Sequence, residues 1–331
     1  HGMNRLRKSS CIGLRALLET AKLHEKAQLR ASDVSYFLAP RINAAGRLGC
    51  ARLVIELLTS ASVQRVTELA RYLDDQNLKR QRIERAIYSE ACRAVEEEAL
   101  EDSPVLVLAS PEWHAGVIGI VAGRLVERYG RPVLLIAVNG DGTIGHGSGR
   151  SVPGFALHEA LRACGDGLLS HGGHAAAAGF KIPYTLIEAF RERFRDYAAR
   201  HLTGAPRGRT LTIDAELPLA TLTVGLLEAV AKLEPYGAGN PRPIFVAGPV
   251  QVVGEPRLVG KGERHVQFRV CQEATTMKAI AFNMAERVHE LLSGGGTCCL
   301  AFTPSINEWR GWRSVQLEVC DFQPGPQARF D

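Results

Sequence analysis

The N-terminal part of the chain has apolar residues at helical spacing. Within residues 13–58 leucines recur three and four positions apart, which predicts two helices joined by a turn. The turn is expected at residues 40–47, where small residues surround two arginines and an asparagine. Residues 63–100 contain neither proline nor glycine, and they are amphipathic near both ends but almost wholly polar in the middle. This pattern predicts one long helix that bridges two bodies, with two helices and a hidden turn as the alternative.

The next part of the chain alternates strand and helix patterns. Short apolar runs at residues 105–108 and 133–136 are typical of buried strands, and residues 116–129 between them are apolar at helical spacing. These three segments predict a βαβ unit. Two further helices are expected at residues 155–161 and 186–197. The block is therefore predicted to be an α/β domain.

The last part of the chain is β-rich. It follows a linker at residues 203–208 that is composed of turn formers, and it opens with a strand at 211–217 and a helix at 222–233. Strands are then predicted at residues 249–253, 266–270, 277–282, 297–303 and 315–319. A short helix near residues 283–292 separates the third strand from the fourth. Five strands with a helix at this place fit a small OB-type barrel.

Composition and charge narrow the class of protein. Of 331 residues 46% are apolar, enough for a real core, and Lys plus Arg outnumber Asp plus Glu by 40 to 35, which gives a net charge of +5. This mild excess is compatible with a polyanionic partner. No apolar run has membrane-spanning length and the N-terminus lacks the features of a secretory signal, so no membrane is expected among the partners. The eight cysteines are scattered without a C-x-x-C pair, which favours free thiols and a cytoplasmic location.

The densest candidate for chemistry is the glycine-rich run at residues 145–155. It follows a predicted strand and precedes a helix, so its backbone N–H groups could converge on an anion. Ser148 and Ser151 add hydroxyl groups and Arg150 adds a guanidinium fork. The spacing fits neither a dinucleotide fingerprint nor a P-loop. We therefore interpret the run as a phosphate-contacting loop, with a flexible hairpin connection as the alternative.

Two further stretches carry candidate polar groups. In the expected turn at residues 40–47, Arg41, Asn43 and Arg47 suit a backbone that approaches an anion, although an ordinary loop with solvated arginines would look the same. In the run His-Gly-Gly-His at residues 171–174, Gly172 and Gly173 allow a tight backbone that presents His174 to a phosphate. A structural histidine is the alternative. This pair of histidines is too weak a pattern to predict a metal site.

Two other sets of candidates lie outside these runs. His114 stands at the start of the first helix of the α/β block, where it could face a cleft. In the last domain Asn307, Trp309, Arg310 and Arg313 belong to a stretch that interleaves aromatic and basic groups. Stacking on aromatic rings and cationic contacts to the backbone are how proteins hold single-stranded nucleic acid. The alternative is a hairpin turn with one core tryptophan and two surface arginines.

Six stretches of the sequence, taken in their order along the chain, carry a resemblance to a known family. They are residues 40–47 (PRINAAGR), 113–122 (WHAGVIGIVA), 147–151 (GSGRS), 172–174 (GGH), 233–241 (LEPYGAGNP) and 306–310 (INEWR). Together, and in this order, they resemble the RecJ family of single-stranded-DNA-specific exonucleases, which is part of the DHH phosphoesterase superfamily. The resemblance covers nearly the whole chain.

The resemblance implies a fold of the class α/β plus β-barrel. Residues 1–62 would be the C-terminal part of a DHH phosphoesterase domain and residues 63–100 the bridging helix. Residues 101–202 would be the DHH-associated α/β domain, and residues 203–331 a five-stranded OB domain that binds nucleic acid. In the family the Asp-His-His motif and the metal-binding aspartates precede these parts. Because the sequence has neither Asp-His-His nor Asp-x-Asp, we expect the chain to begin inside the catalytic domain.

The resemblance also implies an activity. The family hydrolyses single-stranded DNA from the 5′ end in DNA repair and recombination, with Mn²⁺ or Mg²⁺ polarising the phosphodiester and activating water. Arg41, Arg47, Ser148 and Arg150 would hold phosphates near the cleavage site, with His174 at the same cleft. We expect no metal ligand in this chain, and hence no bound cofactor and no nuclease activity when the chain is alone.

Other functions stay open. The expected partner is single-stranded DNA, with a single-strand-binding protein or a helicase as further partners. One alternative is a non-catalytic module that binds single-stranded nucleic acid. Another is a DHH-family phosphodiesterase for short oligonucleotides or cyclic dinucleotides, a class that needs no OB domain, so the β-rich segment from about residue 211 argues against it.

Overall fold

The structure is a computed structural model that describes residues 2–26, 28–202, 211–260, 262–293, 295–309 and 311–325. The chain forms two compact units, His1–Thr210 and Leu211–Asp331. Each unit has cores of its own. The first holds a helical core, and the two faces of a sheet provide two more, whereas the second unit has the core of a barrel.

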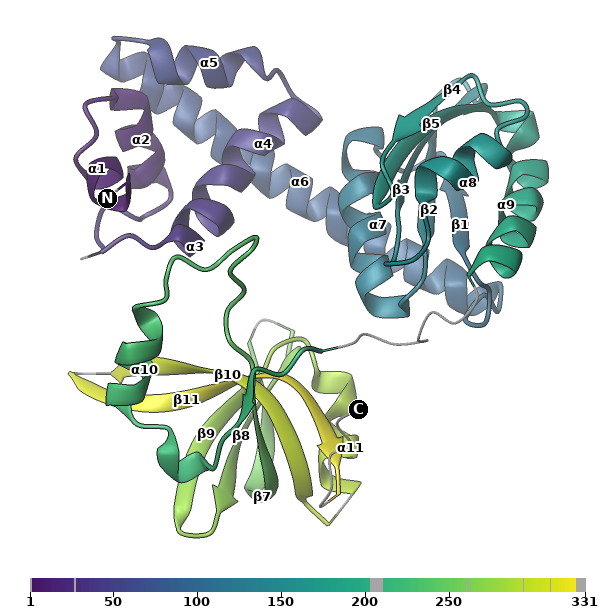
Figure 1. The fold of residues 1–331 in the computed structure, drawn as a ribbon. Coiled ribbons are helices and arrows are strands. Elements are labelled where there is room, and N and C mark those ends of the chain that lie inside the picture. Colours follow the sequence, from purple (N-terminus) through teal and green to yellow (C-terminus); the bar gives the residue numbers. More distant parts are fainter. Residues whose placement is uncertain are drawn as a thin grey trace. The chain divides into compact units, whose positions relative to one another are not determined.

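Short helices open the first unit, and those with buried apolar residues share one core with the N-terminal half of a much longer helix, α6 (Val63–Glu97) (Figure 1). They are α1 (Gly2–Arg7), α2 (Ile12–Thr20), α3 (Ala31–Asp33), a π-helix (Val34–Leu38), α4 (Ala39–Leu48) and α5 (Arg52–Thr59). The turn expected at residues 40–47 is wrong, because these residues are helical. Pro40 lies in the first turn of α4, where a helix needs no backbone N–H, and Ala44 and Ala45 are buried.

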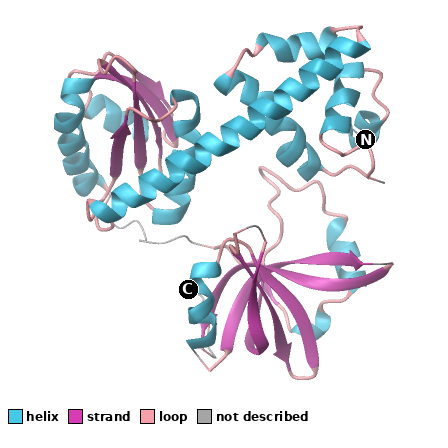
Figure 2. Cartoon of the chain, turned by 180° about the vertical axis from the view of Figure 1, so that it is seen from behind, coloured by secondary structure: helices cyan, strands magenta, loops and turns pink. Residues whose placement is uncertain are grey.

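The predicted bridging helix is confirmed as α6 (Val63–Glu97), a single helix of 35 residues. Ser62 caps its N-terminus by accepting a hydrogen bond from the Arg65 backbone N–H at 3.3 Å. The first half of α6 buries residues such as Leu73 among the short helices, and the second half buries residues such as Ile87 against the α/β region. Figure 2 shows α6 passing from one to the other. The helix thus fixes these two parts of the first unit on one rod.

The α/β region is a five-stranded sheet in the order β1-β2-β3-β5-β4. Its strands are β1 (Leu106–Ser110), β2 (Val133–Val138), β3 (Ile144–Arg150), β4 (Ser170–Gly173) and β5 (Ala177–Pro183), and its helices are α7 (Ala115–Tyr129), α8 (Leu157–Ala163) and α9 (Ile187–His201), the last preceded by a 3₁₀ turn (Tyr184–Leu186). The expected βαβ unit is confirmed, since β1 and β2 are parallel and α7 connects them. Residues of α6 and α7 cover one face of the sheet, and residues of α8 and α9 cover the other.

The phosphate loop expected at the start of residues 145–155 is wrong in its first half, because Ile144–Arg150 is the central strand β3. Its backbone is paired on one side with β2 and on the other with β5, so its N–H groups serve the sheet. Gly147 lies under the ring of Phe180, where no Cβ atom would fit. Gly149 packs against Leu157 in the same way. The glycines therefore make room for core side chains rather than for an anion.

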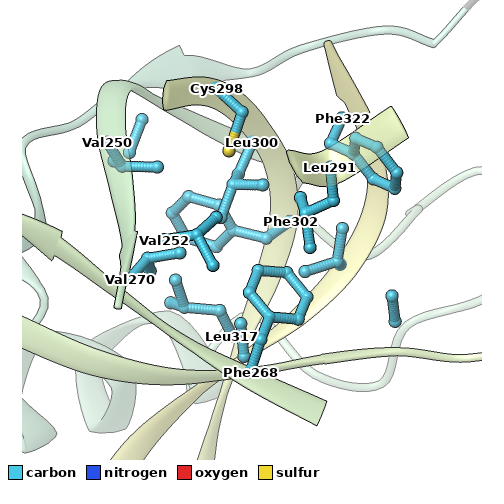
Figure 3. Close-up of a cluster of buried hydrophobic side chains, with 14 of the residues drawn as sticks. Val250, Val252, Phe268, Val270, Leu291, Cys298, Leu300, Phe302, Leu317 and Phe322 are labelled. Atoms are coloured by element: carbon cyan, nitrogen blue, oxygen red, sulfur yellow. The ribbon is translucent and has the colours of Figure 1, made fainter. Parts of the chain in front are cut away.

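The second unit is a closed five-stranded barrel of OB type, as predicted. Its strands are β7 (Phe245–Val259), β8 (His265–Gln272), β9 (Thr275–Ala281), β10 (Thr297–Trp309) and β11 (Trp312–Pro324), and its helical segments are a 3₁₀ turn (Leu219–Thr221), α10 (Val224–Ala231), a second 3₁₀ turn (Ala285–Arg287) and α11 (Val288–Ser293). The pairing of β10 with β7 closes the barrel, and β9 pairs parallel with β11. Figure 3 shows part of its core, in which Phe302 and Phe268 lie among aliphatic side chains.

One strand of this unit is shorter than expected. Of the strand predicted at residues 211–217 only β6 (Ala215–Glu216) is formed, and it pairs parallel with the start of β7. The expected helix between the third and fourth barrel strands is confirmed as α11 together with its preceding 3₁₀ turn.

Candidate nucleic-acid interface

The alternation of β3 places Ser148 and Arg150 on the face of the sheet that α7 covers. Side chains on a strand point in turn to opposite faces, so Gly147 and Gly149 face the core under α8 and α9. On the other face, a Cβ atom at Gly119 of α7 would lie 2.7 Å from Ser148 Oγ and 3.2 Å from Arg150 Nη2. The absence of a side chain at Gly119 therefore lets the polar groups of β3 approach the first turns of α7.

The N-terminus of α7 is capped by a predicted site residue. The ring Nδ1 of His114 accepts a hydrogen bond from the Gly116 backbone N–H at 3.0 Å. His114 is exposed. Its ring is thus engaged in capping, and the Val117 and Ile118 N–H groups donate to the His114 carbonyl. The positive end of the dipole of this 15-residue helix lies here.

Arg47, at the end of α4, reaches the same turn of α7. Its Nη1 donates to the carbonyl oxygen of Gly116 at 3.1 Å. The backbone carbonyl of Arg47 also lies so close to Gly116 that a Cβ atom there would not fit. The structure therefore brings together Arg47, Ser148, Arg150 and the start of α7, which come from three distant parts of the sequence.

The charges at this place are not balanced. Arg150 donates from Nη1 to the Gly149 carbonyl at 2.8 Å and to Ser148 Oγ at 3.5 Å. Within the described residues neither Arg150 nor Arg47 forms an ion pair with a carboxylate. Burial lowers the pKa of the Arg150 guanidinium, and the positive charge of Arg47 lowers it further. Two neighbouring cations without a carboxylate partner among the described residues, beside a helix N-terminus, are a candidate site for an anion.

Arg41 is not part of this cluster in the way the sequence suggested. Its Nη2 lies 2.8 Å from Asp74 Oδ1 of α6, and its Nη1 donates to the Phe37 carbonyl at 2.7 Å. The side chain is only 14% exposed. Its charge is therefore used to join α4 to α6. Asn43, in contrast, is exposed on α4, one helical turn before Arg47.

The other candidates in the α/β region form hydrogen bonds with backbone groups of the sheet and of the loop after β3. Ser151 Oγ donates to the Phe155 carbonyl at 2.7 Å, so this hydroxyl stabilises the loop after β3. Gly172 and Gly173 belong to the exposed edge strand β4, and the His174 N–H donates to the Ala177 carbonyl at 2.8 Å. Since only β5 separates β4 from β3, this strand lies about 10 Å from the strand of Arg150.

In the second unit Asn307, Trp309 and Arg313 lie on the hairpin formed by β10 and β11. Trp309 pairs with Trp312 across the hairpin, and Gly311 takes the left-handed conformation at the turn, with φ of 81°. Trp312 is 82% exposed. Arg313 is tied to α10 by an ion pair in which its Nη1 lies 2.7 Å from Glu228 Oε1. Asn307 is exposed, whereas Arg310 and the side chain of Trp309 lie outside the described residues.

One charged residue that the sequence analysis did not single out lies beside the cluster. Burial lowers the pKa of Arg80, a residue of α6; Glu84 raises it, and the positive charge of Arg47 lowers it again. The sequence feature that could have pointed to Arg80 is the almost wholly polar middle of the bridging helix, which separates its two apolar ends.

The described residues do not form a metal site. In the parts of the chain that the structure describes, no group of three or more His, Cys, Asp or Glu could hold a metal ion. The residues of the cluster are guanidinium, hydroxyl and imidazole groups, and its two arginines, which have no described carboxylate partner, are cations that repel a metal ion. These residues therefore do not fit Mn²⁺ or Mg²⁺. Nor is any described helix long and apolar enough to cross a membrane.

Comparison with known families defines the two folded regions. Residues 102–200 match the DHHA1 domain family, and residues 213–321 match the RecJ OB domain family. The fold therefore defines a class of protein in which a DHHA1 domain is followed by a RecJ OB domain. In the part that it spans, the chain is similar to proteins of the RecJ family. The domain boundaries expected at residues 62, 100 and 202 stay predictions.

Curated relatives and a solved structure support this assignment. The chain is 38% identical over 329 residues to the single-stranded-DNA-specific exonuclease RecJ of Dickeya dadantii, and the match covers 96% of the chain and 56% of that protein. It is 31% identical to the protein of the same name in Bacillus subtilis, covering 100% of the chain and 42% of the relative. The crystal structure of RecJ from Thermus thermophilus in complex with Mn²⁺ matches with a TM-score of 0.81 and 34% identity, over 99% of this chain and 46% of that one. The chain thus spans about half the length of its relatives.

Proposed function

We propose that this chain holds single-stranded DNA for a RecJ-type exonuclease, by binding a backbone phosphate between Arg47, Ser148 and Arg150. The observation that carries the proposal is that Arg47 and Arg150 meet at the N-terminus of α7, and neither has a carboxylate partner among the described residues. An anion from outside the chain would satisfy both guanidinium forks and the helix dipole at once. Because the relatives are named single-stranded-DNA-specific exonucleases, we take this anion to be a phosphate of single-stranded DNA.

The chemistry of the site fits a phosphate of an unpaired strand. Guanidinium groups bind phosphate oxygens through two parallel N–H donors, and the Ser148 hydroxyl adds a third donor beside them. The exposed edge strand with Gly172, Gly173 and His174 presents little side-chain bulk, so a strand could pass along it. The OB barrel, with Trp312 exposed on its hairpin, offers a second place at which bases could stack.

The hydrolysis itself is proposed for the complete enzyme. We infer that the exonuclease acts from the 5′ end, and that the terminal phosphate is the one held at Arg150, because a terminal phosphate carries more negative charge than an internal one. The divalent ions would supply Lewis-acid activation of the phosphodiester and of water. Since the described residues do not fit such ions, the chain alone is expected to bind DNA without cutting it.

The binding of a 5′-phosphorylated oligothymidine by the 331-residue chain, measured by fluorescence anisotropy, tests the phosphate site. Arg150→Ala should weaken binding roughly tenfold or more, the loss expected for a charged hydrogen-bonding partner, with an unchanged circular dichroism spectrum. Arg195→Ala removes an exposed arginine from α9, on the opposite face of the sheet, and should change nothing. Equal affinities for the Arg150→Ala variant and the unmodified chain would contradict the proposal.

A second candidate function is a binding module without catalysis. It is favoured by one observation, the lack of a metal-binding group among the described residues. Incubation of the complete protein with Mn²⁺ and single-stranded DNA separates the two, since digestion from the 5′ end supports the exonuclease, and binding without digestion supports the module. A partnership with a single-strand-binding protein or a helicase remains a proposal for the same complete protein, as does its cytoplasmic location.

A further inference from the structure

Arg80 stands in the polar middle of α6 with its guanidinium group held on two sides. Its Nε and Nη2 donate to Asn77 Oδ1 at 3.3 and 2.8 Å, and its Nη1 donates to Glu84 Oε2 at 2.7 Å. Asn77 is only 3% exposed. These bonds use three of the five N–H donors of an arginine. The group is therefore fixed in orientation and keeps two donors for another acceptor.

The carboxylate beside Arg80 does not neutralise its surroundings. Glu84 also faces Arg124 of α7, whose Nη1 lies 3.1 Å from Glu84 Oε1. One carboxylate thus serves two guanidinium groups. With Arg47 and Arg150 included, four positive charges stand against one negative charge, a net charge of +3.

The positive charges are close enough to affect one another. Burial lowers the pKa of Arg80; Glu84 raises it, and Arg47 lowers it again. Arg47 acts in the same direction on Arg150. Because the side chains of Arg80 and Glu84 are each only 14% exposed, water screens these charges less than it would at the surface. A folded chain keeps such an arrangement at a cost unless a ligand brings the missing negative charge.

We propose that Arg80 is a further phosphate-binding residue, which contacts the same DNA strand as Arg47 and Arg150. The inference rests on the proposed function, and it adds a contact from the bridging helix to those from α4 and β3. The two free N–H groups of Arg80 match the two non-bridging oxygens of a phosphodiester. In this arrangement α6 is part of the binding surface as well as the rod between two parts of the unit.

The salt dependence of binding tests the inference, because it counts phosphate contacts and a purely structural residue leaves it unchanged. For single strands the slope of log K against log salt concentration changes by about 0.7 for each phosphate contact. Arg80→Gln in the 331-residue chain should reduce the slope for a 5′-phosphorylated oligothymidine by about 0.7 and weaken binding roughly tenfold.

Arg93→Gln is the matched control. Arg93 is on the same helix and is also paired with a glutamate four residues later, but Arg93 Nε and Glu97 Oε1 are 3.6 Å apart and both side chains are more than two-thirds exposed, at 69% and 68%. Its slope and affinity should equal those of the unmodified chain. If Arg80→Gln matches Arg93→Gln in both, the inference is overturned.

Two further results keep the test decisive. If Arg80→Gln does not fold, Arg80→Lys keeps the charge but not the planar fork, and it should bind more weakly than the unmodified chain with the slope retained; unchanged affinity would overturn the inference. Arg150→Ala is measured in parallel. A loss of binding in Arg150→Ala but not in Arg80→Gln refutes only the role of Arg80, whereas no loss in either refutes the proposed function.

Discussion

Gly119 of α7 and Ser148 of β3 are in such close contact that a Cβ atom on Gly119 would lie 2.7 Å from Ser148 Oγ. The same atom would lie 3.2 Å from Arg150 Nη2. In Gly119→Ala both polar groups must move, so phosphate binding should weaken severalfold. Alanine favours helix by about 1 kcal/mol over glycine, which offsets part of the strain, and the melting temperature should change little. Anisotropy and thermal unfolding measure the two effects separately.

Gly123, one turn later on α7, provides the control for this substitution. A Cβ atom there would find its nearest neighbour, Arg150 Cγ, at an ordinary contact distance of 4.0 Å. Gly123→Ala should therefore raise the unfolding free energy by about 1 kcal/mol and leave DNA binding unchanged. The contact between α7 and β3 has no part in binding if Gly119→Ala and Gly123→Ala bind DNA equally well.

Arg41 and Arg47 are predicted to respond in opposite ways to substitution. Arg47 donates to a carbonyl and has no carboxylate partner among the described residues, so Arg47→Ala should weaken DNA binding roughly tenfold with little loss of stability. Arg41 is paired with Asp74 in a mostly buried contact, so Arg41→Ala should lower the unfolding free energy by about 1–3 kcal/mol and affect binding less. Urea unfolding and anisotropy on both variants check this; a larger binding loss in Arg41→Ala would reverse the assignment.

Asp33 gives the first unit a pH-dependent contribution to stability. Burial raises the pKa of Asp33, but hydrogen bonds from Lys26 Nζ at 2.5 Å and from the Arg30 N–H at 2.9 Å outweigh this, and the net pKa lies below the ordinary value of 3.8. The charged form is therefore stabilised by folding. This contribution is complete well above pH 3.8 and is lost as the pH falls below it.

Asp33→Asn should accordingly lower the unfolding free energy at pH 7 by about 1–2 kcal/mol. The difference from the unmodified chain should shrink as the pH falls below about 4. Urea unfolding of both proteins at pH 7 and in acid is the measurement. A difference that stays constant down to pH 2 would show that the charge of Asp33 is not the cause.

Among the described aromatic side chains of the barrel, Trp312 is the best placed for base stacking, because 82% of it is exposed on the hairpin between β10 and β11. Trp312→Ala should cost about 1–3 kcal/mol of single-strand binding, the worth of one stacked base, without a change in melting temperature. Tyr184→Ala removes an aromatic residue of the other unit that is 55% exposed and serves as the control. Identical affinities for the two variants would argue that the hairpin does not contact bases.

Segments with a single strong signal could be predicted from the sequence. Residues 63–97 contain no helix breaker, and the polar middle between two apolar ends fits a rod with a different neighbour at each end. The run at 133–136 is apolar throughout because β2 is covered on both faces by helices. The five barrel strands were likewise predicted, although each is longer than its apolar run because the hairpins extend beyond the core.

Segments in which one residue type serves an unusual purpose were predicted wrongly. The glycines of residues 145–149 suggested a loop, whereas they alternate with His146 and Ser148 at the period of a strand and make room for core side chains. Pro40 suggested a turn, whereas it starts a helix. In both cases the local sequence is compatible with two structures, and tertiary packing decides which one forms. The packing partners, such as Phe180, are far away in the sequence.

The candidate site was predicted in part for the same reason. Residue types pointed to Arg47, Ser148 and Arg150, and the fold brings them together. The sequence could not show that Arg41 forms an ion pair with Asp74, since the two residues are on different helices. Nor could it show that Arg80, on the bridging helix, lies near Arg47.

A crystal structure of this chain with a 5′-phosphorylated oligothymidine would show directly whether Arg47, Ser148 and Arg150 bind a phosphate. We expect a phosphate whose oxygens accept hydrogen bonds from Arg150, Ser148 and Arg47 at the start of α7. Oligonucleotide bound to the OB barrel alone, with solvent at Arg150, would contradict this expectation.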